Sequence, residues 1–561
     1  MVSLKGKRTG DFLLFANGLV LVLLLNLLAS NYFFRIDLTE EKRFTIKKQT
    51  KELLNELNDD VYIVVYLDGE LNASFRRLRN SIQEVLDEFR IYSGNKVKVS
   101  FKDPAVALSQ QAKNEFIEEL ASIGITPTRV VEQKDGQTSE KLIFPGAIVF
   151  YGGKEIGVML LKGNKVRTPE EEINQSIEGL EFEFANAIKK LADMDRKRIG
   201  FLSGHGEIDS LVAASFNNAL LEVYDVYKVN LQRKESLNEY DALVIAKPTL
   251  AFSESDKYKL DQYIMDGGRL LMLLDKLDAT MDSASRADYF AFPYELRLDD
   301  LLFKYGVRIN GDLVQDRTSG MYPVVIGQQG GRPQLQMMEW PFFPLINQYS
   351  DHSITRNLDA VLMKFASSID TVKADGITKT PLAFTSAYSR KVAAPVPASV
   401  NEIRRNVKPE NFSAGPVPVG YLLEGKFSSL YNNRFLPEGA DMATFKSEGR
   451  DAKIIIFSDG DMARNEINRR TKNPQQLGFD PFTNYTFANE ELLMNAVAFL
   501  TEEDGLINTR SKEVKIRPLD KEKIRTEKTK WQIINMVLPM LVLVGFGLVR
   551  AYLRKRKFSR A

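Results

Sequence analysis

One short polar loop carries the residue types that could perform acyl transfer. It follows the apolar run 198–202 and consists of Ser203, Gly204, His205, Gly206 and Glu207. A loop that follows a strand lies at the carboxyl edge of an α/β sheet, where such folds usually bind ligands. Serine, histidine and glutamate side chains at that edge suggest a hydrolase triad or a contact with a small ligand.

The spacing of these residues argues against a hydrolase. A catalytic triad normally takes its members from separate elements, so that the base can reach the nucleophile. The Gly-x-Ser-x-Gly nucleophile elbow is also missing around Ser203. We therefore favour a tight glycine turn whose polar side chains satisfy backbone amides at a helix start. Ligand contact remains the alternative.

A second acidic loop follows the apolar run 453–457. It reads Ser458, Asp459, Gly460 and Asp461. Two carboxylates could hold a divalent cation, although an Asx-rich turn is the commoner use of this pattern. We predict no catalytic residue and no metal site, and take Asp459 and Asp461, together with the loop 203–207, as candidate ligand or interaction residues.

A third pattern, from Gly420 to Lys426, comes close to a phosphate-binding Walker A motif. The motif requires Ser or Thr next, to hold magnesium, and the sequence has Phe427 there. The stretch also has the composition of a strand rather than of a strand, loop and helix. We therefore predict no nucleotide site and no cofactor, so the chain cannot power transport by itself.

Composition excludes several other chemistries. The 561 residues include no cysteine, which rules out disulfides, thiol catalysis and zinc-thiolate sites. Only two histidines occur, so a multi-histidine metal centre is impossible. The 76 basic and 74 acidic side chains nearly cancel, and no basic helix with interleaved aromatics stands out. The sequence thus gives no indication of nucleic-acid binding.

Two uncharged apolar runs, 12–34 and 531–549, are long enough to cross a bilayer. A cleaved signal peptide is the rival interpretation of the first run, but its apolar part is too long for one. A buried core helix is the rival interpretation of both. Basic residues flank the outer side of each run, so the positive-inside rule places both termini in the cytoplasm. We predict a two-pass protein of the cytoplasmic (inner) membrane with residues 35–530 in the periplasm.

The periplasmic part is predicted to contain two α/β domains, 35–192 and 193–508. The first has strand-like runs around a helical crossover, in the order of a thioredoxin-like domain, but it lacks Cys-x-x-Cys. Strand-like runs in it are 59–67, 96–101, 128–133, 141–151 and 154–161, and helices are expected at 110–123 and after the capping pattern Thr168 to Glu171.

The second domain alternates strands with helices, which predicts a parallel sheet covered on both faces. Its strands are expected at 198–202, 242–246, 270–274 and 453–457, and helices at 253–265 and 490–500. Residues 320–345 are predicted to be irregular, and 393–418 to be an extended linker or exposed loop. The remaining segments are a cytoplasmic N-terminus (1–11), a juxtamembrane segment (509–530), a second membrane helix (531–552) and a basic cytoplasmic tail (553–561).

Over nearly its whole length, the chain resembles the gliding-motility-associated ABC-transporter auxiliary proteins, the GldG family, often labelled substrate-binding-like. The order of its motifs between two terminal apolar runs carries the resemblance. These motifs are Asp37 to Thr45 (DLTEEKRFT), Phe201 to Glu207 (FLSGHGE), Asp266 to Asp275 (DGGRLLMLLD), Leu301 to Val307 (LLFKYGV), Leu423 to Ser429 (LEGKFSS) and Asp459 to Asn465 (DGDMARN).

This resemblance implies a non-catalytic auxiliary subunit that pairs with an ABC permease and a separate cytoplasmic ATPase, with a role in bacterial gliding and in secretion of adhesins. It also implies a glutamine-amidotransferase-like (Rossmann-type) second domain without the catalytic cysteine. It assigns no ligand residues. Two alternatives stay open: a structural envelope link to the gliding or secretion machinery, and a membrane-anchored hydrolase that uses Ser203 or His205.

Overall fold

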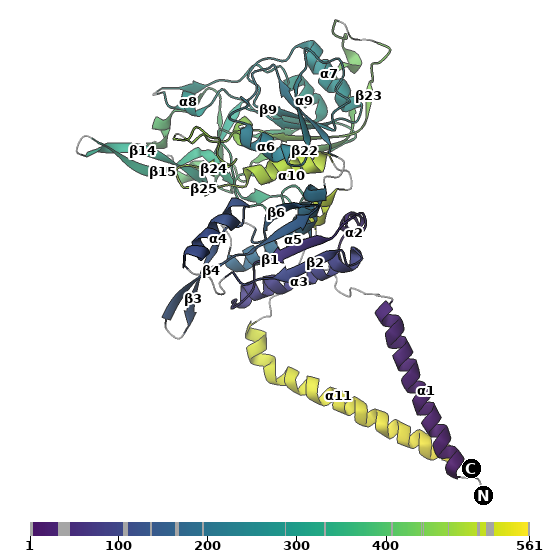
Figure 1. The fold of residues 1–561 in the computed structure, drawn as a ribbon. Coiled ribbons are helices and arrows are strands. Elements are labelled where there is room, and N and C mark those ends of the chain that lie inside the picture. Colours follow the sequence, from purple (N-terminus) through teal and green to yellow (C-terminus); the bar gives the residue numbers. More distant parts are fainter. Residues whose placement is uncertain are drawn as a thin grey trace. The chain divides into compact units, whose positions relative to one another are not determined.

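The structure is a computed structural model, and Figure 1 shows its fold. The residues it describes are 4–31, 45–104, 110–134, 137–162, 168–192, 196–286, 288–329, 332–404, 408–438, 440, 442–468, 470–501, 505–511 and 521–558. The motif 37–44, the end of the first apolar run (32–34), most of the juxtamembrane segment (512–520) and the last three residues lie outside these ranges. The chain divides into two units, 1–512 and 513–561.

The first α/β domain is built on a four-stranded sheet in the order β2-β1-β5-β6. β1 and β2 run parallel, while β5 is antiparallel to both β1 and β6. The elements are α2 (Lys48–Asn55), β1 (Val61–Val65), α3 (Ala73–Tyr92), β2 (Val97–Phe101), α4 (Gln110–Ser122), β3 (Thr128–Lys134), β4 (Gln137–Ile143), β5 (Gly146–Tyr151), β6 (Lys154–Met159) and α5 (Pro169–Ala192).

Local sequence explains where the helices of this domain begin. Asn72 caps α3 by accepting a hydrogen bond from the backbone N–H of Phe75. At α5, the Thr168 hydroxyl accepts from the Glu171 N–H, and the Glu171 carboxylate accepts from the Thr168 N–H. This confirms the predicted capping box. The predicted single strand 141–151 is wrong, because Pro145 separates β4, which pairs with β3, from β5 of the main sheet.

The second domain centres on an eight-stranded sheet in the order β16-β19-β22-β23-β10-β9-β7-β8. Five neighbouring strands run parallel: β7 (Arg198–Ser203), β8 (Asp225–Asn230), β9 (Ala242–Ala246), β10 (Arg269–Leu273) and β23 (Glu448–Phe457). The sequence predicted four of them, and β8 was missed. The prediction of a purely parallel sheet is wrong, since three antiparallel strands extend one edge: β22 (Pro418–Ser428), β19 (Ile377–Phe384) and β16 (Gln348–Tyr349).

Successive side chains of the central strands point to opposite faces of the sheet and pack into two separate core layers. In β9, Val244 packs into one layer, while Leu243 and Ile245 pack into the other. Helices α6 (Ala214–Leu221) and α10 (Asn489–Thr501) contribute to the first layer, and α7 (Glu254–Met265) and α9 (Asp299–Tyr305) to the second. The sheet is therefore covered on both faces, as the apolar strands predicted.

Residues predicted to be irregular form a long hairpin. β14 (Ser319–Gln329) pairs antiparallel with β15 (Arg332–Ile346), and Figure 1 shows this ribbon projecting from the domain. Tyr322 and Val324 point to a third core, whereas Val325 on the opposite face is exposed. The prediction failed because Gly, Pro and Met in this stretch hide the alternation of period two.

Smaller elements complete the second domain. The segment 393–418 is only partly exposed, since Val396 and Ala398 are buried in the third core. The remaining elements are α8 (Met281–Ala284), β11 (Phe290–Ala291), β12 (Val307–Ile309), β13 (Asp312–Asp316), β17 (Val361–Leu362), β18 (Ile369–Thr371), β20 (Ser389–Ala393), β21 (Val396–Pro397), β24 (Phe479–Asp480) and β25 (Tyr485–Thr486), with 3₁₀ turns η1 (Val400–Arg404), η2 (Pro409–Asn411), η3 (Leu430–Asn433), η4 (Gly460–Ala463) and η5 (Leu506–Ser511).

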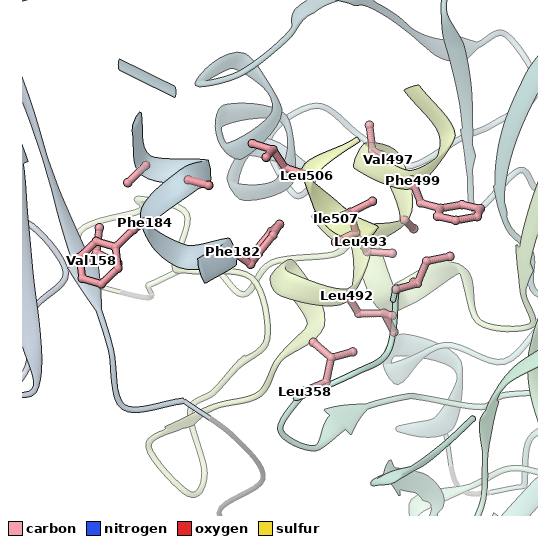
Figure 2. Packing of buried hydrophobic residues seen from close by; sticks show 14 of the residues in the cluster. Val158, Phe182, Phe184, Leu358, Leu492, Leu493, Val497, Phe499, Leu506 and Ile507 are labelled. Carbon is pink, nitrogen blue, oxygen red and sulfur yellow. The ribbon is translucent and has the colours of Figure 1, made fainter. Parts of the chain in front are cut away.

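The two α/β domains share one hydrophobic core. Phe182 and Phe184 of α5, Leu493 of α10 and Ile507 of η5 are buried in the same cluster. Figure 2 shows side chains from these three elements around the junction. A salt bridge between Lys190 and Glu222, with Nζ and Oε2 3.4 Å apart, also joins the domains.

The two terminal helices are α1 (Leu4–Asn31) and α11 (Lys521–Phe558). Within the described residues, only Thr526–Leu553 of α11 is long and apolar enough to cross a membrane. In α1 the corresponding apolar stretch is shorter, Phe12–Leu24. Both stretches carry exposed large apolar side chains, such as Leu14 and Leu543.

Candidate functional site

The segment from Ser203 to Glu207 starts at the last residue of β7 and lies at the carboxyl edge of the sheet, as predicted. Gly204 and Gly206 have φ angles of +121° and +72°, backbone conformations that residues with a side chain rarely adopt. A Cβ atom on Gly206 would lie 2.2 Å from Thr249 Oγ1. Glycine is thus required for this turn, which brings His205 back against the loop after β9.

His205 is held on all sides. Its Nδ1 lies 3.3 Å from Glu207 Oε1, and its Nε2 lies 3.2 Å from Asp256 Oδ2. The imidazole stacks on Phe252, with ring centroids 3.8 Å apart. Burial opposes the charged ring, but the hydrogen bonds to Glu207 and Asp256 outweigh it and raise the pKa of His205.

The carboxylates of Glu207 and Asp256 both contact the His205 ring. Burial disfavours the Glu207 carboxylate, yet hydrogen bonds from the His205 ring and the His205 N–H (2.7 Å) lower its pKa. Asp256 lies in the first turn of α7 and also accepts the Ser253 hydroxyl at 2.6 Å. The histidine therefore clamps the β7 loop to the start of α7.

Ser203 does not join this cluster. Its hydroxyl donates to the Val229 carbonyl at 3.2 Å, while both ring nitrogens of His205 face carboxylates. A serine hydrolase needs its base within hydrogen-bond reach of the nucleophile. Within the described residues, that pairing is absent between Ser203 and His205. The arrangement fits the glycine-turn interpretation and gives no support to a hydrolase.

The acidic loop after β23 lies at the same edge and encloses a lysine that the sequence did not single out. Lys247 follows β9, and its Nζ lies 2.7 Å from Asp275 Oδ2 and 2.6 Å from Asp461 Oδ2. Asp275 follows β10 and accepts the Gly460 N–H at 2.5 Å. Three loops, one from each of three neighbouring parallel strands, thus converge on one buried ammonium group.

The electrostatics of this cluster follow from its burial. Burial lowers the pKa of Lys247, but the carboxylates of Asp275 and Asp461 outweigh it and raise that pKa overall. Burial likewise opposes ionisation of Asp461, and the Lys247 charge outweighs it, so the Asp461 pKa is lowered. For Asp459, burial raises the pKa, and the neighbouring Asp275 and Asp461 raise it further.

Asp459 caps the 3₁₀ turn η4. Its two oxygens accept the backbone N–H groups of Lys364 and Asp461, each at 2.7 Å. Asp461 is engaged by Lys247. Across the part of the chain that the structure describes, no group of three or more His, Asp or Glu side chains could hold a metal ion.

The loop after β9 links the two predicted loops. The N–H groups of Thr249 and Leu250 both donate to the His205 carbonyl, at 2.9 and 2.8 Å, while Lys247 in the same loop reaches Asp461. Sequence reasoning missed Lys247, Asp256 and Asp275. The signal for Lys247 and Asp275 was present, because each is a charged residue directly after an apolar strand.

A cavity of about 740 Å³ opens beside Asp461. Its walls come from α8, the hairpin β14–β15, the segment 362–364 and the loops that follow Asp461. Lys364 lies in this wall, with Nζ 3.1 Å from Glu466 Oε1. Of the seven candidate residues named from the sequence, only Asp461 lines the cavity.

Comparison with known proteins finds a family match over the domain that contains these loops. A family model described as an ABC-type uncharacterized transport system matches residues 196–496. The chain belongs to this family. A second model, a domain of unknown function (DUF7088), matches residues 40–150.

An uncharacterized protein from Borreliella burgdorferi is 24% identical to the chain over 539 residues, which cover 93% of this chain and 94% of that relative. Among solved structures, the mmIFT52 N-terminal domain is similar at 12% identity over 55% of this chain and 98% of its own, with a TM-score of 0.30.

Proposed function

We propose that the chain is a non-catalytic, membrane-anchored auxiliary subunit of an ABC transport system, and that it pairs with a permease and a separate cytoplasmic ATPase. The observation that carries the proposal is the family match across 196–496, the domain that contains the whole loop edge. The clamped His205 adds support, since both ring nitrogens already face carboxylates.

The proposal includes the location of the subunit. Both termini lie in the cytoplasm, α1 and α11 cross the inner membrane, and the two α/β domains lie in the periplasm. The apolar length of α11 supports this topology, and so do the basic residues on the outer flank of each apolar run. ATP would then act on the partner ATPase and reach this subunit only through the membrane.

The proposal also covers fold likeness and biological role. The strand order β2-β1-β5-β6 supports a thioredoxin-like first domain, and the parallel strands with helices on both faces support an amidotransferase-like second domain. The role in gliding motility, with envelope gliding or secretion components as further partners, rests on the motifs that resemble that family.

Purification of the full chain in gentle detergent, followed by mass spectrometry, tests the proposal. We expect an ATPase with a Walker A motif and a multi-span permease to copurify in constant proportion. Recovery of envelope components without either protein would contradict it and favour a structural link. His205→Ala should copurify the same partners, because both ring nitrogens of the histidine are engaged by carboxylates of this chain.

A further inference from the structure

The hairpin β14–β15 carries an exposed apolar face. Directly opposed residues share one face of an antiparallel ribbon, and the pairs Pro323–Met337 and Val325–Leu335 are neighbours along this one. Val325, Leu335 and Met337 are 45%, 60% and 41% exposed. The opposite face, with Val324, packs on the third core. Figure 1 shows the ribbon projecting from the domain, so this apolar face is displayed as a contact surface would be.

The edges of the ribbon are closed to a partner strand. Proline has no N–H, so the pairs that contain Pro323 and Pro333 cannot exchange both ladder hydrogen bonds, and both nitrogens face outward. A register shift between Val325 and Gly327 also interrupts β14. Prolines and bulges at an edge oppose strand addition. Lipid fits no better, because backbone groups at a ribbon edge would lose their hydrogen bonds in hydrocarbon. A partner must therefore contact the apolar face.

The charges of the ribbon make it complementary to itself. Between residues 318 and 339 the sequence has two charged residues, Arg332 at the tip end of β15 and Glu339 near its base. They have opposite sign and lie about 23 Å apart along the strand. When two such ribbons stack face to face and run antiparallel, Arg332 of each copy lies over Glu339 of the other. Leu335, close to the midpoint between them, then faces its own counterpart.

The size of the face suits a weak contact between anchored copies. The pairs from Met321–Glu339 to Gln328–Pro333 cover a ribbon about 20 Å long and about 10 Å wide. That area is well below the about 800 Å² per partner that a stable interface buries. Anchoring by α11 would confine the copies to one membrane and raise their effective concentration, so that a small face is sufficient.

We propose that this face joins two copies of the chain. The β14–β15 ribbons stack antiparallel through Val325, Leu335 and Met337, and Arg332 of each copy pairs with Glu339 of the other. This inference goes beyond the proposed function and takes only the membrane anchor from it.

Site-specific crosslinking tests the contact, since the chain contains no cysteine. Full-length Leu335→Cys in isolated membranes, treated with a short bismaleimide, should give a covalent dimer of this chain. Gln336→Cys is the matched control, because Gln336 is the next residue, is also exposed and belongs to the pair Val324–Gln336. It should give about tenfold less dimer, since its side chain points to the other face. A fluorescent maleimide checks that the two cysteines are equally reactive.

Charge reversal tests the orientation. In the Leu335→Cys background, Arg332→Glu or Glu339→Arg alone sets like charges together at both ends of the stack and should lower the dimer yield about fivefold. The two reversals combined restore opposite charges between copies and should restore the yield. Compensation within one chain would not do so, because about 23 Å exceeds the Debye length of about 8 Å at physiological salt.

Three results would overturn the proposal: equal dimer yields from the two cysteine variants, no dimer from Leu335→Cys, or an adduct of Leu335→Cys with a different protein in place of the dimer. A combined reversal that does not restore the yield would overturn the antiparallel stack. Crosslinking requires neither permease nor ATPase, so a dimer that forms while copurification fails would contradict the proposed function alone. Copurification without a dimer would contradict this inference alone.

Discussion

Lys247 Nζ lies 2.6 Å from Asp461 Oδ2 and so joins the loop after β9 to the loop after β23, across the intervening strand β10. Asp275, at the end of β10, completes the cluster at 2.7 Å. Lys247 adopts a φ angle of +52°, which is unusual for a residue with a side chain. The position tolerates this backbone because the surrounding contacts fix it.

Lys247→Met should be strongly destabilising. It would leave Asp275 and Asp461 buried without their counter-charge, and removing one partner of a buried ion pair costs about 3–5 kcal/mol. Pulse proteolysis of the full chain in urea would measure the change. The control is Lys373→Met, whose exposed ion pair with Asp375 should contribute no more than about 0.5 kcal/mol. Equal losses in the two variants would contradict this prediction.

The His205 clamp should make stability depend on pH. The folded pKa of His205 is raised above its ordinary value of 6.5, so its contribution is complete below pH 6.5 and is lost as pH rises through the folded value. The folded pKa of Glu207 is lowered from 4.5, so its contribution is complete above that pH. His205→Gln should therefore lose most stability between about pH 4.5 and 6.5, and less in alkaline buffer.

His352 provides the opposite case. Burial and the nearby Lys453 charge lower its pKa, and its Nδ1 accepts the Ile354 N–H in the neutral state. The stability it contributes should be complete above about pH 6.5 and should be lost as pH falls from 6.5 through the lowered folded pKa. Denaturant titrations of His205→Gln and His352→Gln at several pH values should show opposite trends. Parallel trends would refute the clamp as the source of the pH dependence.

The absence of cysteine makes topology directly measurable. Each introduced cysteine is a unique reporter, and Phe435 is fully exposed on the second domain. In intact cells with a permeable outer membrane, a membrane-impermeant maleimide should label Phe435→Cys but not Ser559→Cys in the basic tail. Labelling of Ser559→Cys should require permeabilised inner membranes. The reverse pattern would overturn the proposed topology.

Gly545 and Gly547 in α11 should differ in their effect on the permease. Two residues turn an α-helix by about 200°, so these glycines point to nearly opposite sides. Among the residues that the structure describes, no atom outside the helix's own backbone and the neighbouring residues lies within 4 Å of a Cβ built at either position. If close packing uses one side, either Gly545→Leu or Gly547→Leu, but not both, should lower permease recovery in the detergent purification. Unchanged recovery in both variants would exclude glycine-mediated packing.

Sequence patterns predicted what is local in this fold. The capping box at Thr168 and Glu171, the helix expected at 253–265 and the four predicted parallel strands each depend on neighbouring residues, and all were found where expected. The antiparallel strand β22 was recognised as a strand, but its direction depends on pairing with β23, which no local pattern encodes.

The site was harder to predict, because its members meet only after the sheet forms. Glu207 is two residues from His205, but the second carboxylate on the imidazole is Asp256, which belongs to α7. Likewise, the role of Asp461 follows from its ion pair with Lys247, a residue that comes after a different strand. The cavity walls come partly from the hairpin β14–β15, a region that the sequence predicts to be irregular.

The common core of the two α/β domains has a mechanical consequence. Domains that meet through a small polar interface usually swing on a hinge, but here Phe182 of α5 and Ile507 of η5 are buried in one continuous apolar cluster. Protein interiors are stiff and pass strain onward. A torque applied to the first domain would therefore turn the second with it as a single lever, rather than being dissipated at the joint between them.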